Sequence, residues 1–163
     1  VTEVVSERDV DDVAAVVDAD QIGARTMHSG ALLKAVGAAK KPVLLKRAFS
    51  ATLEEWLLAG EACLLAGAPS VIFCERGVRG PDNGNRNVLD VGAVAVLAGV
   101  YGLPVVVDPS HAAGRKDVVV ALGNAGLAAG ACGVVVEVHD HPEDALADLK
   151  SARQYLNLLL ASQ

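Results

Sequence analysis

The sequence contains few aromatic residues and few cysteines. Aromatic side chains make up 3% of the chain, and the three cysteines stand far apart, at positions 63, 74 and 132. An odd number of cysteines at wide spacing does not suggest a disulfide framework, so we interpret them as small buried residues. This use of cysteine is typical of a reducing compartment, and we therefore expect a cytoplasmic protein.

Long apolar runs and an excess of positive charge are also missing. No run reaches the roughly 18 apolar residues that a membrane-spanning helix needs. The opening residues, Val1–Glu3, do not have the pattern of a signal peptide. The net charge of −6 disfavours nucleic acids and anionic membranes as partners. We expect neither partner, and any local cluster of cations becomes informative.

Two common catalytic motifs are absent as well. The chain has no Gly-x-Ser-x-Gly nucleophile motif. The glycine-bearing segment 77–84 has the spacing of neither a P-loop nor a dinucleotide-binding turn. Ser110 and His111 are adjacent in the sequence, and adjacent residues of an extended strand point to opposite faces. We therefore do not expect them to act as a nucleophile and its base.

Alanine, valine, leucine and glycine dominate the chain, and hydrophobic residues make up 52% of its 163 residues. That is enough for one domain with a sizeable core. Apolar runs predict buried strands at 42–45, 70–74, 104–107 and 133–139, and two short strands are expected before them, at 1–5 and 18–22. Capping residues and helical periodicity predict helices at about 6–17, 31–39, 52–66, 89–100, 117–129 and 142–160.

The alternation of strand and helix indicates the fold class. A regular strand–helix order predicts an α/β protein whose parallel strands are joined by crossover helices. Strands that are apolar throughout indicate a sheet covered on both faces. No linker divides the chain, so we expect residues 1–163 to form a single domain.

Charged and polar residues follow the predicted strands. The carboxyl ends of parallel strands lie on one face, where ligands bind. These residues are Glu3, Arg25, Lys46, Arg47, Glu75, Arg76, Arg79, Asp108, Ser110, His111, Arg115, Glu137 and His139. Cations that converge from several strands repel one another unless an anion compensates them. The pattern predicts a substrate with phosphate or carboxylate groups, although Arg47, Arg79 and Lys116 are each also compatible with a surface position.

A second group combines an imidazole with two carboxylates. His111, Glu137 and Asp148 offer the ligand types that suit a divalent first-row metal such as Mn, Fe, Co or Zn. On spacing alone, three further histidines are alternative ligands: His28, His139 and His141.

Several segments together resemble a known family. They are Gln21-Ile22-Gly23-Ala24-Arg25, Lys41-Pro42-Val43-Leu44-Leu45-Lys46-Arg47, Cys74-Glu75-Arg76-Gly77, Arg86-Asn87-Val88-Leu89-Asp90, Asp108-Pro109-Ser110-His111-Ala112-Ala113-Gly114-Arg115 and Glu137-Val138-His139. In this order they resemble the type I β 3-deoxy-D-arabino-heptulosonate 7-phosphate (DAHP) synthases. The related 3-deoxy-D-manno-octulosonate 8-phosphate synthases share several of these segments.

The resemblance implies a TIM (β/α)8 barrel, of which this chain supplies six βα units, as a partial catalytic domain. It implies condensation of phosphoenolpyruvate with erythrose 4-phosphate and water, with release of phosphate, as the first step of the shikimate pathway. A divalent metal would polarise the aldehyde, and we expect a homo-oligomer.

The resemblance also assigns roles to individual residues. It implies catalytic roles for Lys46 and His111. The implied substrate-binding residues are Arg25, Lys46, Glu75, Arg76, Ser110 and Arg115, and the implied metal ligands are His111, Glu137 and Asp148.

The chain also departs from the family pattern. Its first strand matches the third strand of the barrel. The two earlier strands, which carry a cysteine metal ligand and a Lys-Pro-Arg-Thr motif for the tetrose phosphate, have no counterpart here. The residue after Asp148 is Leu149, where the family usually has a small residue. We expect either a part of a longer enzyme or a truncated, non-catalytic relative that binds anions or a partner chain. The octulosonate synthase activity is a third alternative.

Overall fold

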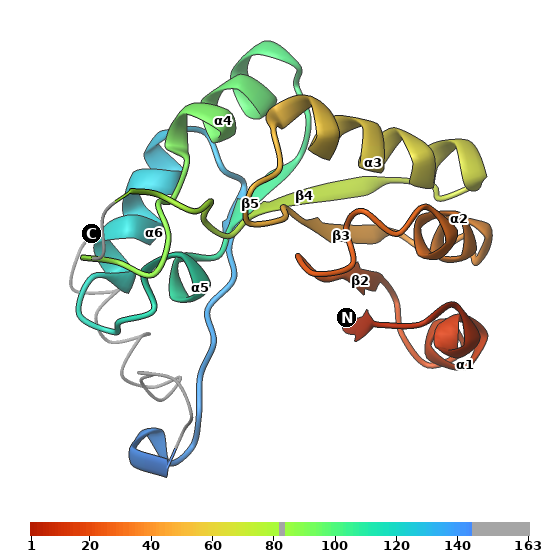
Figure 1. Cartoon of the computed structure of the whole chain (residues 1–163), viewed down its shortest axis with the longest axis horizontal. Helices are drawn as coiled ribbons and strands as arrows, with labels where there is room; N and C mark the ends of the chain where they lie inside the picture. Colours follow the sequence, from red (N-terminus) through yellow and green to blue (C-terminus); the bar gives the residue numbers. More distant parts are fainter. Residues whose placement is uncertain (82–83, 145–163) are drawn as a thin grey trace.

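A single parallel sheet organises the molecule. The computed structural model describes residues 1–81 and 84–144, and its six strands lie in chain order across the sheet (Figure 1). The strands are β1 (Thr2–Val4), β2 (Asp20–Ile22), β3 (Val43–Lys46), β4 (Val71–Glu75), β5 (Val105–Val107) and β6 (Gly133–Val134). Every neighbouring pair is parallel, as the alternating pattern predicted.

Helices connect the strands. They are α1 (Val10–Ala14), α2 (Gly30–Ala38), α3 (Leu53–Ala66), α4 (Val91–Ala95), α5 (Pro109–Ala113) and α6 (Val119–Ala128). The predicted capping box starts α3, because the Glu55 backbone N–H donates to Thr52 Oγ1 and the Thr52 N–H donates to the Glu55 carboxylate. Gly67 ends this helix with a φ of 120°, which favours glycine.

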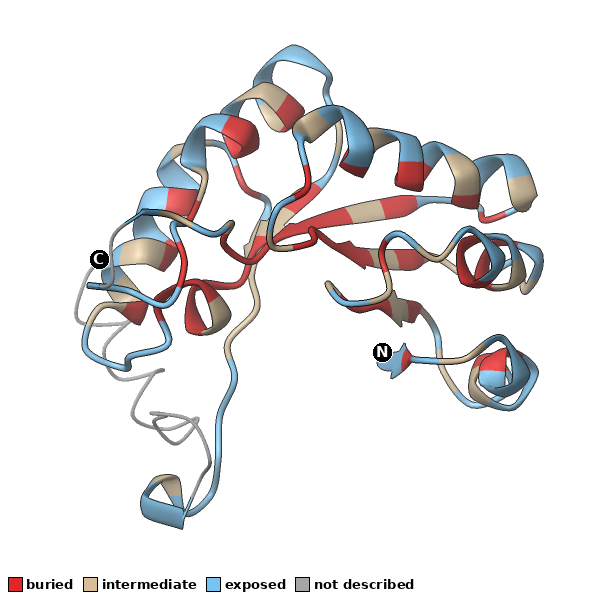
Figure 2. Ribbon diagram, viewed as in Figure 1, coloured by how far each residue is buried: buried red, intermediate tan, exposed pale blue. Residues whose placement is uncertain are grey.

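The core lies between the sheet and the helices. One row of paired residues crosses five strands, from Val4 through Ile22, Leu45 and Phe73 to Val105. All five side chains are buried. Figure 2 shows buried residues concentrated in the strands and on the helix faces turned toward them. No helix among residues 1–81 and 84–144 is both long enough and apolar enough to cross a membrane.

The other face of the sheet differs from the prediction. Sequence analysis expected both faces to be covered, but Gln21, Leu44, Ile72 and Val106 on this face are only half-buried. The side chains of the strands are therefore fully buried only on the face that the helices cover. Six strands in this order form an open, curved sheet, and no element described in this structure closes over its inner face.

The last strand is shorter than predicted. The apolar run predicted a strand over 133–139, whereas β6 ends at Val134. The Val135 N–H still donates to the Val107 carbonyl, at 2.8 Å. Beyond that point β5 has ended, because Asp108 and Pro109 begin a helix, so the following residues lose their ladder partner. Hydrophobic pattern alone could not indicate where the neighbouring strand stops.

The segment after β5 is helical, although the sequence analysis treated it as the tip of a strand. Asp108 caps α5, with Pro109 in its first turn, and Gly114 ends it with a φ of 65°. Ser110 and His111 therefore follow helical geometry, and the strand-alternation argument about their side chains does not apply. The predicted first helix is also shorter and consists of a 3-10 turn, Glu7–Asp9, followed by α1.

The helices predicted at 31–39, 52–66, 89–100 and 117–129 are confirmed, with changed ends. The helix predicted at 89–100 is α4 followed by a π-helical turn, Val96–Val100. Of the helix predicted at 142–160, the structure describes a 3-10 turn at Pro142–Asp144. Residues 145–163 lie outside the described residues.

Helices α2 and α3 touch closely at Gly37. A Cβ at this glycine would lie 2.5 Å from the Cys63 carbonyl oxygen and 2.6 Å from the Ala66 Cβ. We predict that Gly37→Ala lowers the free energy of unfolding by about 2 kcal/mol, because the helices must separate. Chemical denaturation measures this change.

Gly30→Ala is the matched control in the same helix, since a Cβ there meets nothing within 4 Å. It should leave stability unchanged or raise it by up to about 1 kcal/mol. Equal effects of the two substitutions would contradict the packing argument.

Candidate active site

A cavity opens where the strands end, on the face predicted from the sequence. Its volume is about 140 Å³. The C-terminal ends of β3, β4 and β5 lie near one another (Figure 1), and residues at or just after these ends line the cavity. It is lined by Glu3, Ala24, Arg25, Lys46, Phe49, Arg76, Arg86 and His111. Four residues predicted to belong to the site therefore face one space: Arg25, Lys46, Arg76 and His111.

Arg76 is the most deeply placed cation of the cavity, with 3% of its surface exposed. Its guanidinium stacks on the Phe49 ring, 4.5 Å from the ring centroid. Its Nη1 is buried and has no hydrogen-bond partner among the described residues. Burial lowers the pKa of Arg76. An unpaired, buried N–H donor beside a cavity is costly unless a bound anion satisfies it.

Asp108 connects three parts of the site. Its Oδ1 accepts the His111 backbone N–H at 3.1 Å, which caps α5. Its Oδ2 accepts Lys46 Nζ at 2.9 Å and lies 2.8 Å from His111 Nδ1. Burial opposes ionisation of this carboxyl, but the His111 hydrogen bond and the Lys46 charge hold the pKa of Asp108 below its ordinary value. Sequence analysis placed Asp108 at a strand end without assigning it a role in the site.

His111 and Glu137, two of the predicted metal ligands, lie close to each other. Their Nε2 and Oε2 atoms are 3.6 Å apart. Ser110 helps to place Glu137, because its Oγ accepts the Glu137 backbone N–H at 3.1 Å. Ser110 is buried and does not line the cavity. The third predicted ligand, Asp148, lies outside the described residues.

Arg47 and Glu75 form a structural ion pair on the helix side of the sheet. Arg47 Nη1 lies 2.9 Å from Glu75 Oε2 and 2.9 Å from Asp90 Oδ2. Glu75 also accepts the Gly77 N–H at 2.7 Å, and burial raises the pKa of its carboxyl against the charge of Arg47. Arg47 is therefore a buried structural cation, and Glu75, predicted to bind substrate, does not line the cavity.

Arg115 is likewise not among the cavity-lining residues. Its guanidinium pairs with Asp117, with Nη2 2.6 Å from Oδ2, and also donates to the Gly84 carbonyl at 3.3 Å. Arg115 follows Gly114, which ends α5, and its side chain is exposed.

Comparison with known proteins identifies the family. Residues 1–161 match the family model described as the DAHP synthetase I family. The chain belongs to this family. It is 45% identical, over 95% of its length, to the phospho-2-dehydro-3-deoxyheptonate aldolase of Thermotoga maritima. It is 32% identical, over 91% of its length, to a 2-dehydro-3-deoxyphosphooctonate aldolase of Acidithiobacillus ferrooxidans.

Solved structures of the DAHP synthetase I family confirm the predicted fold. A truncated 3-deoxy-D-arabino-heptulosonate 7-phosphate synthase from Thermotoga maritima superposes with a TM-score of 0.92 at 42% identity, and covers 98% of this chain and 62% of that chain. The chain is thus six βα units of a TIM (β/α)8 barrel. It spans about half the length of the curated relatives it matches, 46% and 56% of the two named above.

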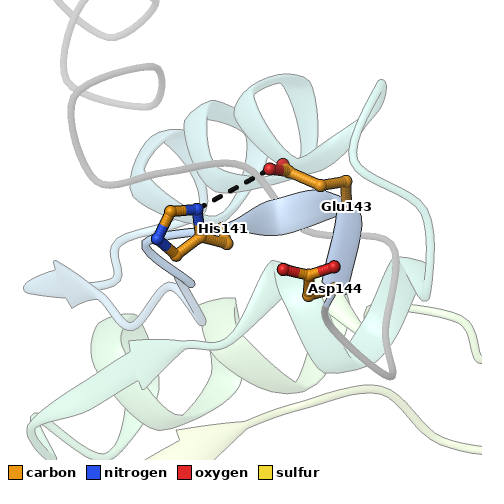
Figure 3. A group of neighbouring side chains, drawn as sticks. All are labelled: His141, Glu143 and Asp144. Carbon is orange, nitrogen blue, oxygen red and sulfur yellow. Dashed lines mark ion pairs between the residues drawn. The ribbon is translucent and has the colours of Figure 1, made fainter.

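A different group of potential metal ligands lies elsewhere. His141, Glu143 and Asp144 place one ligand atom each within 4.8 Å of one another, and His141 pairs with Glu143 (Figure 3). All three residues are exposed. His141 was an alternative ligand in the sequence analysis. The pair His111–Glu137 is the better candidate in a DAHP synthetase I protein, because His111 lines the cavity and is oriented by a buried carboxylate.

Four cavity residues were not assigned to the site from the sequence: Glu3, Ala24, Phe49 and Arg86. Glu3 was recognised only as a strand-end residue. Arg86 stood inside a segment that carries the family resemblance, which was a usable signal. Phe49 carried no sequence signal of this kind, because an aromatic residue after a strand is ordinarily a core residue.

The Arg47 cluster generates a prediction about pH. Asp90 caps α4 and accepts Arg47, and although burial opposes ionisation, these interactions hold the pKa of Asp90 below its ordinary value. The contribution of its charge is present above the unfolded-state pKa and is lost as pH falls through the folded-state pKa. We predict that Asp90→Asn lowers the free energy of unfolding by about 0.5–1 kcal/mol at pH 7.

The difference between wild type and Asp90→Asn should shrink toward zero in denaturant titrations between pH 7 and pH 3. Asp18→Asn is the control, because Asp18 is exposed and has no ion pair within the described residues. A difference for Asp90 that does not change with pH would contradict this account.

Proposed function

We propose that the chain is the catalytic part of a DAHP synthase. It condenses phosphoenolpyruvate with erythrose 4-phosphate and water and releases phosphate. The observation that carries this proposal is the buried Arg76 Nη1, which has no partner among the described residues and borders a cavity that Lys46 also lines. The name of the 45% identical Thermotoga relative supports it.

The cations of the cavity hold phosphoenolpyruvate. Its phosphate and carboxylate groups take charge-assisted hydrogen bonds from Arg25, Lys46 and Arg76. Phe49 keeps the guanidinium of Arg76 in one plane by stacking. Asp108 keeps the Lys46 ammonium group in place, so the charges are arranged before the substrate arrives.

His111 and Glu137 would hold a divalent metal, with Asp148 as the proposed third ligand. The donor set fits such an ion. His111 Nδ1 is engaged by Asp108, which leaves Nε2 as the atom facing Glu137. Imidazole and carboxylate are suited to Mn, Fe, Co or Zn. When bound, the metal supplies Lewis-acid polarisation of the aldehyde of erythrose 4-phosphate.

The protein side chains contribute position and charge to the reaction. The methylene carbon of phosphoenolpyruvate forms a bond to the aldehyde carbon as its C=C π bond opens, and the aldehyde oxygen takes up a proton to become a hydroxyl group. Water adds to the cationic C2 and gives up a proton, and the bond from C2 to the phosphate oxygen then breaks, which releases phosphate and leaves a ketone at C2. The Lys46 ammonium group and the arginines stabilise negative charge on the substrates during these steps. Glu75 and Ser110 act by positioning, the first through Arg47 and Gly77 and the second through Glu137. A substrate contact by Arg115, a cytoplasmic location and a homo-oligomer stay predictions.

The reaction can be tested by phosphate release. We expect the protein, supplied with Mn²⁺ and phosphoenolpyruvate, to release phosphate with erythrose 4-phosphate and much less with arabinose 5-phosphate. A chelator should stop release, and Mn²⁺ should restore it. A preference for arabinose 5-phosphate would indicate an octulosonate synthase. Phosphoenolpyruvate binding by a folded sample without turnover would indicate a non-catalytic relative.

The assignment of the metal site makes a separate prediction. Asp108→Asn weakens the interaction that orients His111, so it should lower the affinity for Mn²⁺ about ten- to a hundredfold in equilibrium dialysis. His141→Ala is the matched control and should leave the affinity unchanged. If His141→Ala removes binding and Asp108→Asn does not, the metal site is the exposed cluster and the assignment to His111 is wrong.

A further inference from the structure

Helix α3 has a second row of apolar side chains, on its outer side. The row that faces the sheet includes Trp56 and Cys63 and is buried. Leu58 and Leu65 lie on the opposite side of the helix and keep 54% and 82% of their surfaces exposed. Residues seven apart lie on one side of a helix, and Ala62 stands between these two leucines. Single exposed leucines are ordinary on a protein surface, but this spacing is that of the contact row in a helix that packs on another helix.

A groove lies beside this outer row, between α3 and its neighbour α2. The two helices run side by side (Figure 1). The groove has a volume of about 400 Å³ and is lined by Lys34 of α2 and by Ala62, Leu65 and Ala66 of α3. Because the two alanines are small, the groove can accept an apolar side chain from another molecule. The same surface therefore offers projecting leucines and a recess that can receive one.

The charges beside the outer row are separated along the helix. Glu54 lies in the first turn of α3 and Glu61 near its middle, and both are exposed. Lys34 lies at the groove, beside the C-terminal half of α3. Lys40 lies near the end of α3, because a Cβ on Gly67 would be 4.0 Å from its Cγ. Within residues 1–81 and 84–144, none of these four charged side chains takes part in an ion pair. Positive and negative charges are thus available to a partner at opposite ends of one apolar row.

A second copy of the chain complements this surface when its α3 runs antiparallel. A two-fold axis through the middle of the outer row places Leu58 of each copy opposite Leu65 of the other. The same rotation brings Glu61 of one copy to Ala62 of the other, where Lys34 lines the groove. In coiled coils, charges beside the apolar row select partner and orientation in this way. A parallel copy would instead place Glu61 opposite Glu61, in a protein with a net charge of −6.

We propose that the outer row of α3 and the groove between α2 and α3 form an isologous interface between two copies of this chain. Antiparallel α3 helices pack through Leu58 and Leu65, and Lys34 pairs with Glu61 of the other copy on both sides of the two-fold axis. No residue that lines the groove also lines the cavity at the strand ends. Association through this surface therefore leaves the candidate active site open to substrates.

Sedimentation velocity at a series of protein concentrations measures the Kd of the dimer and tests the proposed pairing. The wild type should dimerise. Lys34→Glu and Glu61→Lys each place like charges opposite one another, so each should raise the Kd by about tenfold or more. The double variant Lys34→Glu/Glu61→Lys exchanges the signs of both partners and should recover the wild-type Kd. An equimolar mixture of the two single variants should form a heterodimer, because every facing pair is then of opposite sign.

A second pair of variants tests the apolar row. Leu65→Asp should remove the dimer, because it places a carboxylate in the centre of the contact. Leu127→Asp is the matched control, since Leu127 is 43% exposed on α6 and does not line the groove. It should leave the Kd unchanged, and circular dichroism verifies that each variant is folded.

Three results would overturn the proposed interface. The first is a wild type that stays monomeric, which would leave a different protein as the occupant of the outer row. The second is a dimer that Leu65→Asp leaves intact or that Leu127→Asp weakens equally, which would place the contact on another surface. The third is a folded double variant that does not regain the affinity lost in the single variants, which would exclude the pairing of Lys34 with Glu61.

Discussion

The site depends on one carboxylate that is completely removed from water. Asp108 has no exposed surface, and an isolated charge in such a place would be strongly destabilising. It is tolerated because three donors surround it: the first turn of α5, His111 and Lys46. Each donor comes from a part of the chain that has a role in the proposed reaction. The requirement to pair one buried charge therefore aligns a helix, a histidine and a lysine at the same time.

The Asp108 carboxylate joins two groups of side chains, which form the two halves of the site. Lys46 and Arg76 lie toward β3 and β4 and provide positive charge, while His111 and Glu137 lie toward β5 and β6 and provide ligand atoms. Asp108 contacts one member of each half. Displacement of either would leave a buried acceptor partly unsatisfied, which costs free energy. The relative position of the two halves is thus maintained by the same interaction that stabilises the local fold.

The sequence predicted the sheet well because its signals are local and repeated. Apolar runs such as Val105–Val107, separated by helices, define parallel strands wherever they occur. Convergence of Arg25, Lys46 and Arg76 follows from topology alone. The roles of Arg47 and Glu75 could not be predicted, because burial on the helix side depends on which neighbours pack there.

The helical conformation of α5 could not be predicted from the sequence pattern either. Asp108 followed by Pro109 is a helix start as well as a strand end, and a five-residue helix has too few residues to show periodicity. The helix is also held by a tertiary contact, since the Asn87 side chain donates to the His111 carbonyl, and local pattern carries no sign of that contact. The end of β6 was misjudged for a related reason, since strand length depends on the partner strand as much as on the residues themselves.

The adjacent cations Lys46 and Arg47 show what strand register means for this protein. Lys46 points to the cavity and Arg47 to the helix layer, where it contacts Glu75 and lies over Trp56. A shift of β3 by one residue would exchange the two faces. It would bury the flexible ammonium group among groups arranged for a planar guanidinium, and would present the guanidinium to the ligand. The cavity therefore has the correct cation only when β3 pairs with its neighbours in the correct register. A molecule that folded with β3 misaligned would contain the same residues but would not present Lys46 to the ligand.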